Sequence, residues 1–70
     1  MAFKQGETVT WHWGSGTAKG KVTEVFTDKV TRQIKGKDIT RNASTDEPAY
    51  LIEQDDGDLV LKSGSELYAG

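Results

Sequence analysis

The chain has 70 residues, of which 34% are hydrophobic and 29% charged, and its mean hydropathy is −0.63. This length suits one small domain over residues 1–70 and excludes two catalytic lobes or a βαβ cofactor fold. No apolar run approaches the ~20 residues of a membrane span, no N-terminal stretch resembles a secretory signal, and cysteine is absent. We therefore expect a soluble, cytoplasmic domain without disulfides, cofactors or membrane contact.

Charge is unevenly distributed along the chain, although the net charge is only −2. Residues 1–42 hold eight Lys and Arg against four Asp and Glu, whereas residues 43–70 hold one Lys against seven acidic residues. Two explanations fit this asymmetry. Either the two halves attract each other across the fold, or a basic binding surface lies beside an acidic one.

Alternating apolar and polar residues predict strands in the first part of the chain. Within Thr8–Trp13, the side chains of Val9, Trp11 and Trp13 share one face, and a Gly-rich turn follows. The next strand covers residues 20–26, where the apolar residues fall out of phase by one position. This phase change predicts a β-bulge near Thr23 and Glu24.

A hairpin is predicted from two further strands, residues 30–34 and 39–42. Gly36 suits the first central position of a two-residue type II′ turn, because glycine tolerates a positive φ there. This register places Arg32 opposite Arg41, and like charges in that position destabilise a ladder. The sequence therefore predicts either an acidic group between the two arginines or a different register.

The second half of the chain also reads as strands. Ala49–Gln54 and Leu59–Lys62 flank an Asp-Asp-Gly-Asp turn at residues 55–58. Ser63 and Glu66 have the spacing of a capping box, which predicts one short helical turn.

Five or six short strands with Gly-rich turns indicate an all-β fold. We expect a small SH3-like or Tudor-like barrel, because closure protects strand edges, with a short C-terminal helical turn. The predicted core consists of Val9, Trp11, Val22, Val25, Tyr50, Ile52, Val60, Leu61 and Leu67.

Catalytic and metal chemistry find little support in the sequence. His12, the only histidine, alternates with the two tryptophans and is expected to face solvent, so we predict no catalytic residues. Asp55, Asp56 and Asp58 offer oxygen ligands for Ca²⁺ or Mg²⁺, but the run lacks an EF-hand pattern and suits a plain turn. We therefore predict no metal site, and the Gly-rich segment after Trp13 departs from a phosphate-binding loop.

Exposed aromatic and basic side chains are the remaining candidates for a binding site. Trp13, at the end of its strand, is the best candidate for an exposed aromatic ring. Aromatic rings in a small barrel either form the core, cage a methylated ammonium group or stack on unpaired bases. The basic hairpin suits phosphate contacts, whereas the pI of 5.2 argues for a solvated, partly neutralised surface. The candidate ligand-binding residues are Trp11, Trp13, Phe26, Tyr50, Arg32, Lys35, Lys37 and Arg41.

The sequence resembles the hypervirulence-associated Tudor-domain family in three stretches: GETVTWHWGSGTAKGKV (residues 6–22), IKGKDITRN (34–42) and PAYLIEQDDGDLVLKSGSEL (48–67). The resemblance implies a Tudor/SH3-like barrel that binds a ligand, and it implies no reaction. It also implies that Trp11, Phe26 and Tyr50 are the positions where cage aromatics lie. The hairpin from Arg32 to Arg41 departs from a minimal Tudor core.

Two functions remain open at this stage. The first is a non-enzymatic binding module whose partner is a protein segment or a nucleic acid. The second is a structural or stress-related protein that self-associates through its oppositely charged halves. For the oligomeric state we expect a monomer or a weak homodimer.

Overall fold

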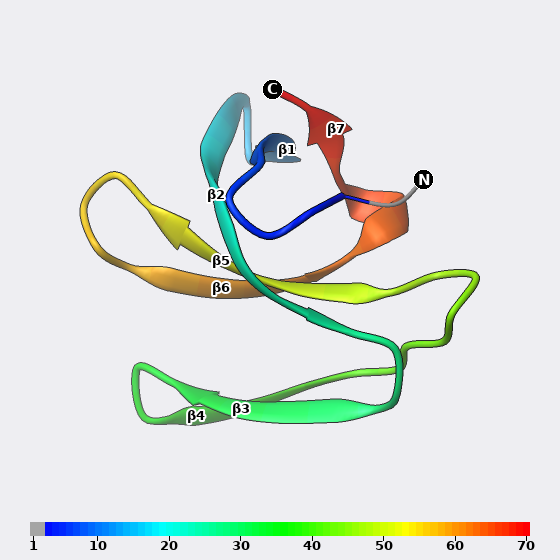
Figure 1. The fold of residues 1–70 in the computed structure, drawn as a ribbon. Helices are drawn as coiled ribbons and strands as arrows, with labels where there is room; N and C mark the ends of the chain where they lie inside the picture. Colours follow the sequence, from blue (N-terminus) through cyan, green and yellow to red (C-terminus); the bar gives the residue numbers. More distant parts are fainter. Residues whose placement is uncertain (1–2) are drawn as a thin grey trace.

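The computed structural model describes residues 3–70 and is all-β in that part of the chain. Residues 3–70 form seven strands and one turn of 3-10 helix: β1 (Thr8–Trp13), β2 (Gly16–Phe26), β3 (Val30–Ile34), β4 (Lys37–Arg41), β5 (Ala49–Gln54), β6 (Leu59–Ser63), η1 (Gly64–Glu66) and β7 (Tyr68–Ala69). They make a five-stranded sheet in the order β6-β5-β2-β1-β7 and a separate two-stranded sheet, β3-β4 (Figure 1).

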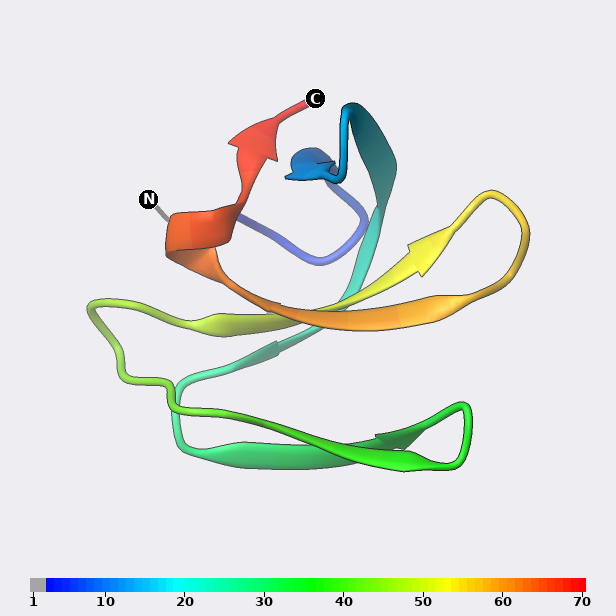
Figure 2. The same ribbon diagram turned by 180° about the vertical axis from the view of Figure 1, so that it is seen from behind.

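The two sheets are arranged in layers. The β3–β4 hairpin lies beneath the β5–β6 pair, while β1 and β7 lie on the other side of that pair (Figures 1 and 2). The expected all-β class and the short C-terminal helical turn are both confirmed. A closed barrel of five to six strands is not confirmed, because no ladder within residues 3–70 joins β3–β4 to the larger sheet.

The main core fills the space between β5–β6 and β1. Its fully buried members are Tyr50, Ile52, Val9 and Val22. Phe3, which is not among the predicted core residues, packs edge-on to Tyr50 at 5.5 Å, and its N–H donates to the Tyr50 hydroxyl at 3.0 Å. The remaining buried members of this cluster are Trp11 and Leu67, with Val60 partly buried against it.

Val25 is the exception among the predicted core residues, since it is 40% exposed. The ladder between β1 and β2 ends where Thr8 pairs with Lys21. Val25 therefore lies beyond the part of β2 that β1 covers, which leaves its side chain facing solvent.

The β5–β6 pair is buried on a second face as well. Ala49–Ile52 are all buried, although successive residues of a strand point to opposite faces. Leu51 pairs with Leu61 across the ladder, and both belong to the face opposite the main core. Ile34 and Ile39 of the hairpin are half-buried and line the same space as Leu61. The hairpin thus covers the second face.

β2 contains the bulge that the sequence predicted, and the strand continues from it towards the hairpin. The ladder with β5 shifts register between Val22 and Glu24. Beyond it, Arg32 contacts the Glu24 carboxylate at 3.1 Å and lies 5.1 Å from the Phe26 ring. Both side chains of the ion pair are about half exposed, so it contributes well under ~1 kcal/mol.

The hairpin register differs from the predicted one. Ile34 pairs with Lys37, so Lys35 and Gly36 form the turn, and Arg32 lies opposite Ile39. Lys35 and Gly36 both have positive φ, 52° and 78°, as a type I′ turn requires. The shift separates the two arginines and removes the repulsion that the predicted register would have created.

A close approach between β2 and β5 leaves no room for a side chain at Gly20. A Cβ atom there would lie 2.6 Å from the Glu53 carbonyl oxygen and 2.6 Å from Ile52 Cγ2. We expect Gly20→Ala to lower the free energy of unfolding by about 3 kcal/mol, measured by urea denaturation. Gly16→Ala is the matched control, since it lies in the same strand with nothing within 4 Å of the added methyl. Equal stabilities of the two variants would contradict the packing described here.

Candidate functional site

Two adjoining hollows flank β6 and form one groove. The first, of about 250 Å³, lies between β6 and the hairpin. The second, of about 450 Å³, extends from β6 to the tip of the β1–β2 hairpin. Lys35, Gln54, Val60 and Lys62 line both hollows, and we call the combined space the β6 groove.

The two tryptophans of β1 contribute to the groove in different ways. Alternation places both on one face of the strand, but Trp11 is 3% exposed and Trp13 is 69% exposed. Trp13 ends β1 immediately before the turn that Gly14 begins with φ 54°. The groove therefore has a buried indole in its wall and a free indole at its rim.

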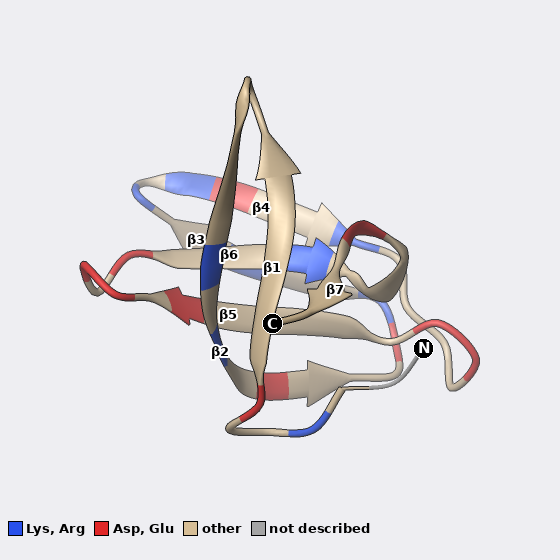
Figure 3. Cartoon of the chain, turned by 90° about the horizontal axis from the view of Figure 1, so that it is seen from above, with Lys and Arg blue, Asp and Glu red and all other residues tan. Residues whose placement is uncertain are grey.

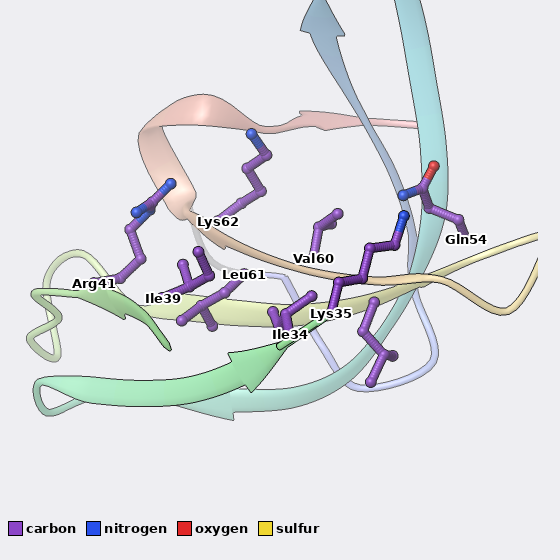
Figure 4. Close-up of a pocket in the computed structure, with 9 residues that line it drawn as sticks. Ile34, Lys35, Ile39, Arg41, Gln54, Val60, Leu61 and Lys62 are labelled. Carbon is purple, nitrogen blue, oxygen red and sulfur yellow. The ribbon is translucent and has the colours of Figure 1, made fainter. Parts of the chain in front are cut away.

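Three cationic side chains surround the apolar floor of the groove. Figure 4 shows Arg41 and Lys62 on one side of the apolar side chains and Lys35 beside Gln54 on the other. Lys35 comes from the hairpin turn, Arg41 from the end of β4 and Lys62 from β6. The floor between them is formed by Ile34, Ile39, Val60 and Leu61, together with Leu59.

Ion pairs connect this cationic rim to the acidic half of the chain. Lys35 Nζ lies 2.8 Å from Asp58 Oδ2, because the β3–β4 and β5–β6 turns lie at the same end of the molecule (Figure 3). Arg41 Nε lies 4.0 Å from Glu66 Oε2. The first of the two explanations for the uneven charge therefore holds within one chain.

The two ion pairs are not equivalent. Hydrogen bonding to Asp58, followed by the charge of that carboxylate, raises the pKa of Lys35 above its ordinary value. Arg41 Nε is buried and has no hydrogen-bond partner within residues 3–70. Arg41 Nε therefore has only the Glu66 charge at 4.0 Å, whereas the ammonium of Lys35 is engaged by Asp58 at 2.8 Å.

Four of the eight candidate residues lie away from the groove. Tyr50 is fully buried in the main core, and Phe26 lies against Arg32 beneath the sheet. Arg32 is engaged by Glu24, while Lys37 is exposed outside the groove lining. Of the other four, Trp11, Trp13 and Lys35 line the hollow that extends to the β1–β2 tip, and Lys35 and Arg41 line the hollow beside the hairpin. The aromatic positions implied by the resemblance do not meet in one cage.

Lys62 was not among the residues predicted for the site. Lys62 is the one cation among residues 43–70, so it stood apart from the basic stretch in the sequence. β6 lies beside the hairpin in space, and Lys62 therefore lines the same hollow as Arg41. The sequence indicated the face of the strand on which Lys62 lies, through the alternation along residues 59–62, but it did not indicate the neighbours of that face.

The remaining polar features of the sequence lie elsewhere or support turns. His12 is exposed and edge-on to Tyr68 at 5.3 Å, on the face of β1 opposite Trp11. Asp56 Oδ1 accepts the Asp58 N–H at 2.9 Å, so this carboxylate stabilises its own turn. Within residues 3–70 no cluster of acidic and histidine side chains suited to a metal ion was found. In the same range, no helix is long and apolar enough to cross a membrane.

Comparison with known proteins gives one match. The sequence profile of the family described as "Hypervirulence associated proteins TUDOR domain" matches residues 6–67, which span β1 through β6 and η1. No curated protein and no solved structure matches the chain.

Removing the Asp58 carboxylate tests the contact between hairpin and sheet. We expect Asp58→Asn to lower the pKa of Lys35 towards its ordinary value, measured by NMR titration of the lysine side chains. Because the folded-state pKa is raised, the stabilisation is complete at neutral pH and is lost as the pH rises through that pKa. The stability difference between wild type and variant should therefore vanish in alkaline solution.

Asp55→Asn is the control, because Asp55 belongs to the same turn and forms no ion pair with Lys35. An unchanged Lys35 titration in the Asp58 variant would show that the two turns do not meet in solution.

Proposed function

Because the chain belongs to the hypervirulence-associated TUDOR-domain family, we propose that residues 1–70 form one non-enzymatic binding module for an extended protein segment. The observation that supports this proposal most directly is the β6 groove. Along two adjoining hollows, it combines an exposed indole, an apolar floor and cationic side chains, with Asp56 and Asp58 lining the hollow that holds the indole.

Each part of the groove has a role in this proposal. Trp13 supplies a large apolar surface that has little rotamer freedom to lose on binding. The isoleucines of the hairpin contact apolar side chains of the ligand, and Lys62 and Arg41 hold its polar groups. Tryptophan and arginine are the side chains that most often dominate binding energy at protein interfaces.

A nucleic acid fits the groove less well than a protein segment. Phosphate binding needs several free cations along one track, and its affinity grows with their number. Here Arg32 and Lys35 are each paired with a carboxylate, and Arg41 has Glu66 at 4.0 Å. Lys37, the remaining candidate cation of the hairpin, lies outside the groove lining.

Self-association has less support in the structure than peptide binding has. The opposite charge of the two halves suggested self-association. These charges pair within one copy through Lys35–Asp58 and Arg41–Glu66. A catalytic role also lacks support, because His12 contacts Tyr68 on the opposite face of β1 from the groove.

The role of Trp13 is tested by substitution and peptide binding. An array of eight-residue peptides selects the tightest binder, and its affinity is measured by NMR titration of backbone amides and indole N–H groups. We expect Trp13→Ala to weaken binding about tenfold without changing the unfolding midpoint, since the indole is 69% exposed. Tyr68→Ala is the matched control, because Tyr68 is an exposed aromatic on the other side of β1.

A parallel titration with single- and double-stranded oligonucleotides at about 50 mM salt includes the competing class of ligand. Amide shifts at the hairpin that fade with added salt, without any response to peptides, would contradict the proposal.

A further inference from the structure

The outer edge of β6 is an unpaired strand edge. β6 is the terminal strand of its sheet and pairs only with β5 within residues 3–70. The backbone carbonyl oxygen of Asp58 accepts a hydrogen bond from Gln54 N–H at 2.8 Å, and Gly64 N–H donates to the backbone carbonyl oxygen of Pro48 at 2.9 Å. Hydrogen bonding in an antiparallel pair alternates along each strand. The even-numbered residues of β6 therefore bond to β5, and the odd-numbered ones direct their N–H and C=O groups outward.

One end of this edge is already occupied. Ser63 N–H, which points outward, donates to Glu66 Oε2 at 3.1 Å. The Glu66 carboxylate therefore occupies the outward N–H group at this end of β6. The outward groups of Leu59 and Leu61 enter no strand ladder within residues 3–70.

The hollow beside the hairpin runs along this same edge. All four consecutive residues Leu59–Lys62 line it, although neighbouring side chains of a strand point to opposite faces. A cavity can touch both sets only where it lies alongside the strand, at its edge. Its volume of about 250 Å³ is available next to the unpaired backbone groups.

The charge around the edge selects the kind of segment that fits. Lys35, Arg41 and Lys62 line this hollow, whereas Asp56 and Asp58 line the adjoining one and not this one. Lys35 is paired with Asp58 and Arg41 has Glu66 at 4.0 Å, so Lys62 is the cation of this hollow that enters no ion pair within residues 3–70. Arg41 Nε has no hydrogen-bond acceptor among the described residues, and the carboxylate paired with it, Glu66, lies 4.0 Å away. The guanidinium also carries N–H donors beyond Nε, and a ligand carboxylate that accepts from one of them forms a charge-assisted hydrogen bond.

We infer that the β6 groove binds an extended acidic segment of a partner protein, which adds to β6 as a further strand. The backbone of the segment bonds to Leu59 and Leu61, its apolar side chains contact Ile34 and Ile39, and one carboxylate accepts from Arg41. This inference rests on the proposed function and specifies its ligand and binding mode. It uses backbone pairing for affinity and side-chain pockets for selection.

Other occupants fit the same edge less well. A second copy paired through β6 would bring two sets of Lys62 and Arg41 together, and this repulsion opposes a symmetric dimer. A nucleic acid lacks the alternating donors and acceptors that a strand edge matches. The experiment distinguishes both of these occupants from an acidic segment.

The experiment measures amide hydrogen exchange with a synthetic probe. The probe is an acetylated, amidated eight-residue peptide that alternates Thr and Val and carries one central Glu. At saturation we expect exchange at Leu59 to slow at least tenfold more than at Val60, because Val60 already bonds to β5. Replacing the probe's Glu with Lys should weaken binding at least tenfold.

Backbone methylation separates strand addition from other modes of binding. Two probes are N-methylated at alternate positions, one set odd and one set even. Strand addition requires that one of them loses at least tenfold in affinity and that the other binds as before, since only one set of amides faces β6.

Matched protein variants test the carboxylate contact. Arg41→Gln should weaken the Glu probe about tenfold and leave the Lys probe no weaker than before. Lys37→Gln, on the same strand but outside the groove lining, should change neither affinity more than twofold.

The outcomes distinguish this inference from the function on which it rests. Peptide binding that shifts Trp13 but leaves Leu59 exchange unchanged would overturn strand addition alone. Failure of every peptide in the array and of the probe to bind would overturn both. A dimer of the free protein with Leu59 already protected, or the same protection by an oligonucleotide, would assign the edge to a different occupant and overturn the inference.

Discussion

The burial of β5 on both faces is the constraint on which the rest of the structure depends. Ala49–Ile52 alternate between two apolar environments, the main core around Tyr50 and the layer beneath it around Leu51. A five-stranded sheet of this size can cover only one of these faces with its own curvature. The second face needs a separate element, and the β3–β4 hairpin provides it through Ile34 and Ile39. Because the hairpin packs on the sheet without joining its ladder, a groove remains between them.

Local patterns in the sequence predicted the features that neighbouring residues determine. The alternation of Val9 and Trp11, the bulge beyond Val22 and the Glu66 bond to the Ser63 N–H all depend on residues a few positions apart. The hairpin register was wrong because Gly36 suits either central position of a two-residue turn. Its actual place depends on Lys35 taking a positive φ, which no local rule favours. Val25 was wrong because its exposure depends on where β1 ends.

The candidate site could be predicted only in part, for a related reason. The exposed Trp13 followed from its place at the end of an alternating strand, and Lys35 and Arg41 followed from the basic stretch. Tyr50 was ambiguous because alternation indicates a shared face without indicating which face is covered. Lys62 joins the rim only because β6 lies beside a hairpin that ends at Arg41, 21 positions before Lys62. Such proximity is a property of the packed layers and leaves no local signal.

The charges of the groove answer two physical requirements at once. An open strand edge invites pairing with identical chains, and charged side chains at the edge are a common protection against it. Lys62 and Arg41 oppose a second copy of β6, and the Glu66 carboxylate occupies the Ser63 amide where that edge ends. The same cations attract a segment that carries carboxylates. Glu66 and Asp58 hold part of this positive charge in the free protein, so an acidic ligand must compete with internal partners. A segment whose backbone also bonds to Leu59 and Leu61 can do so, because the internal carboxylates offer those groups no strand.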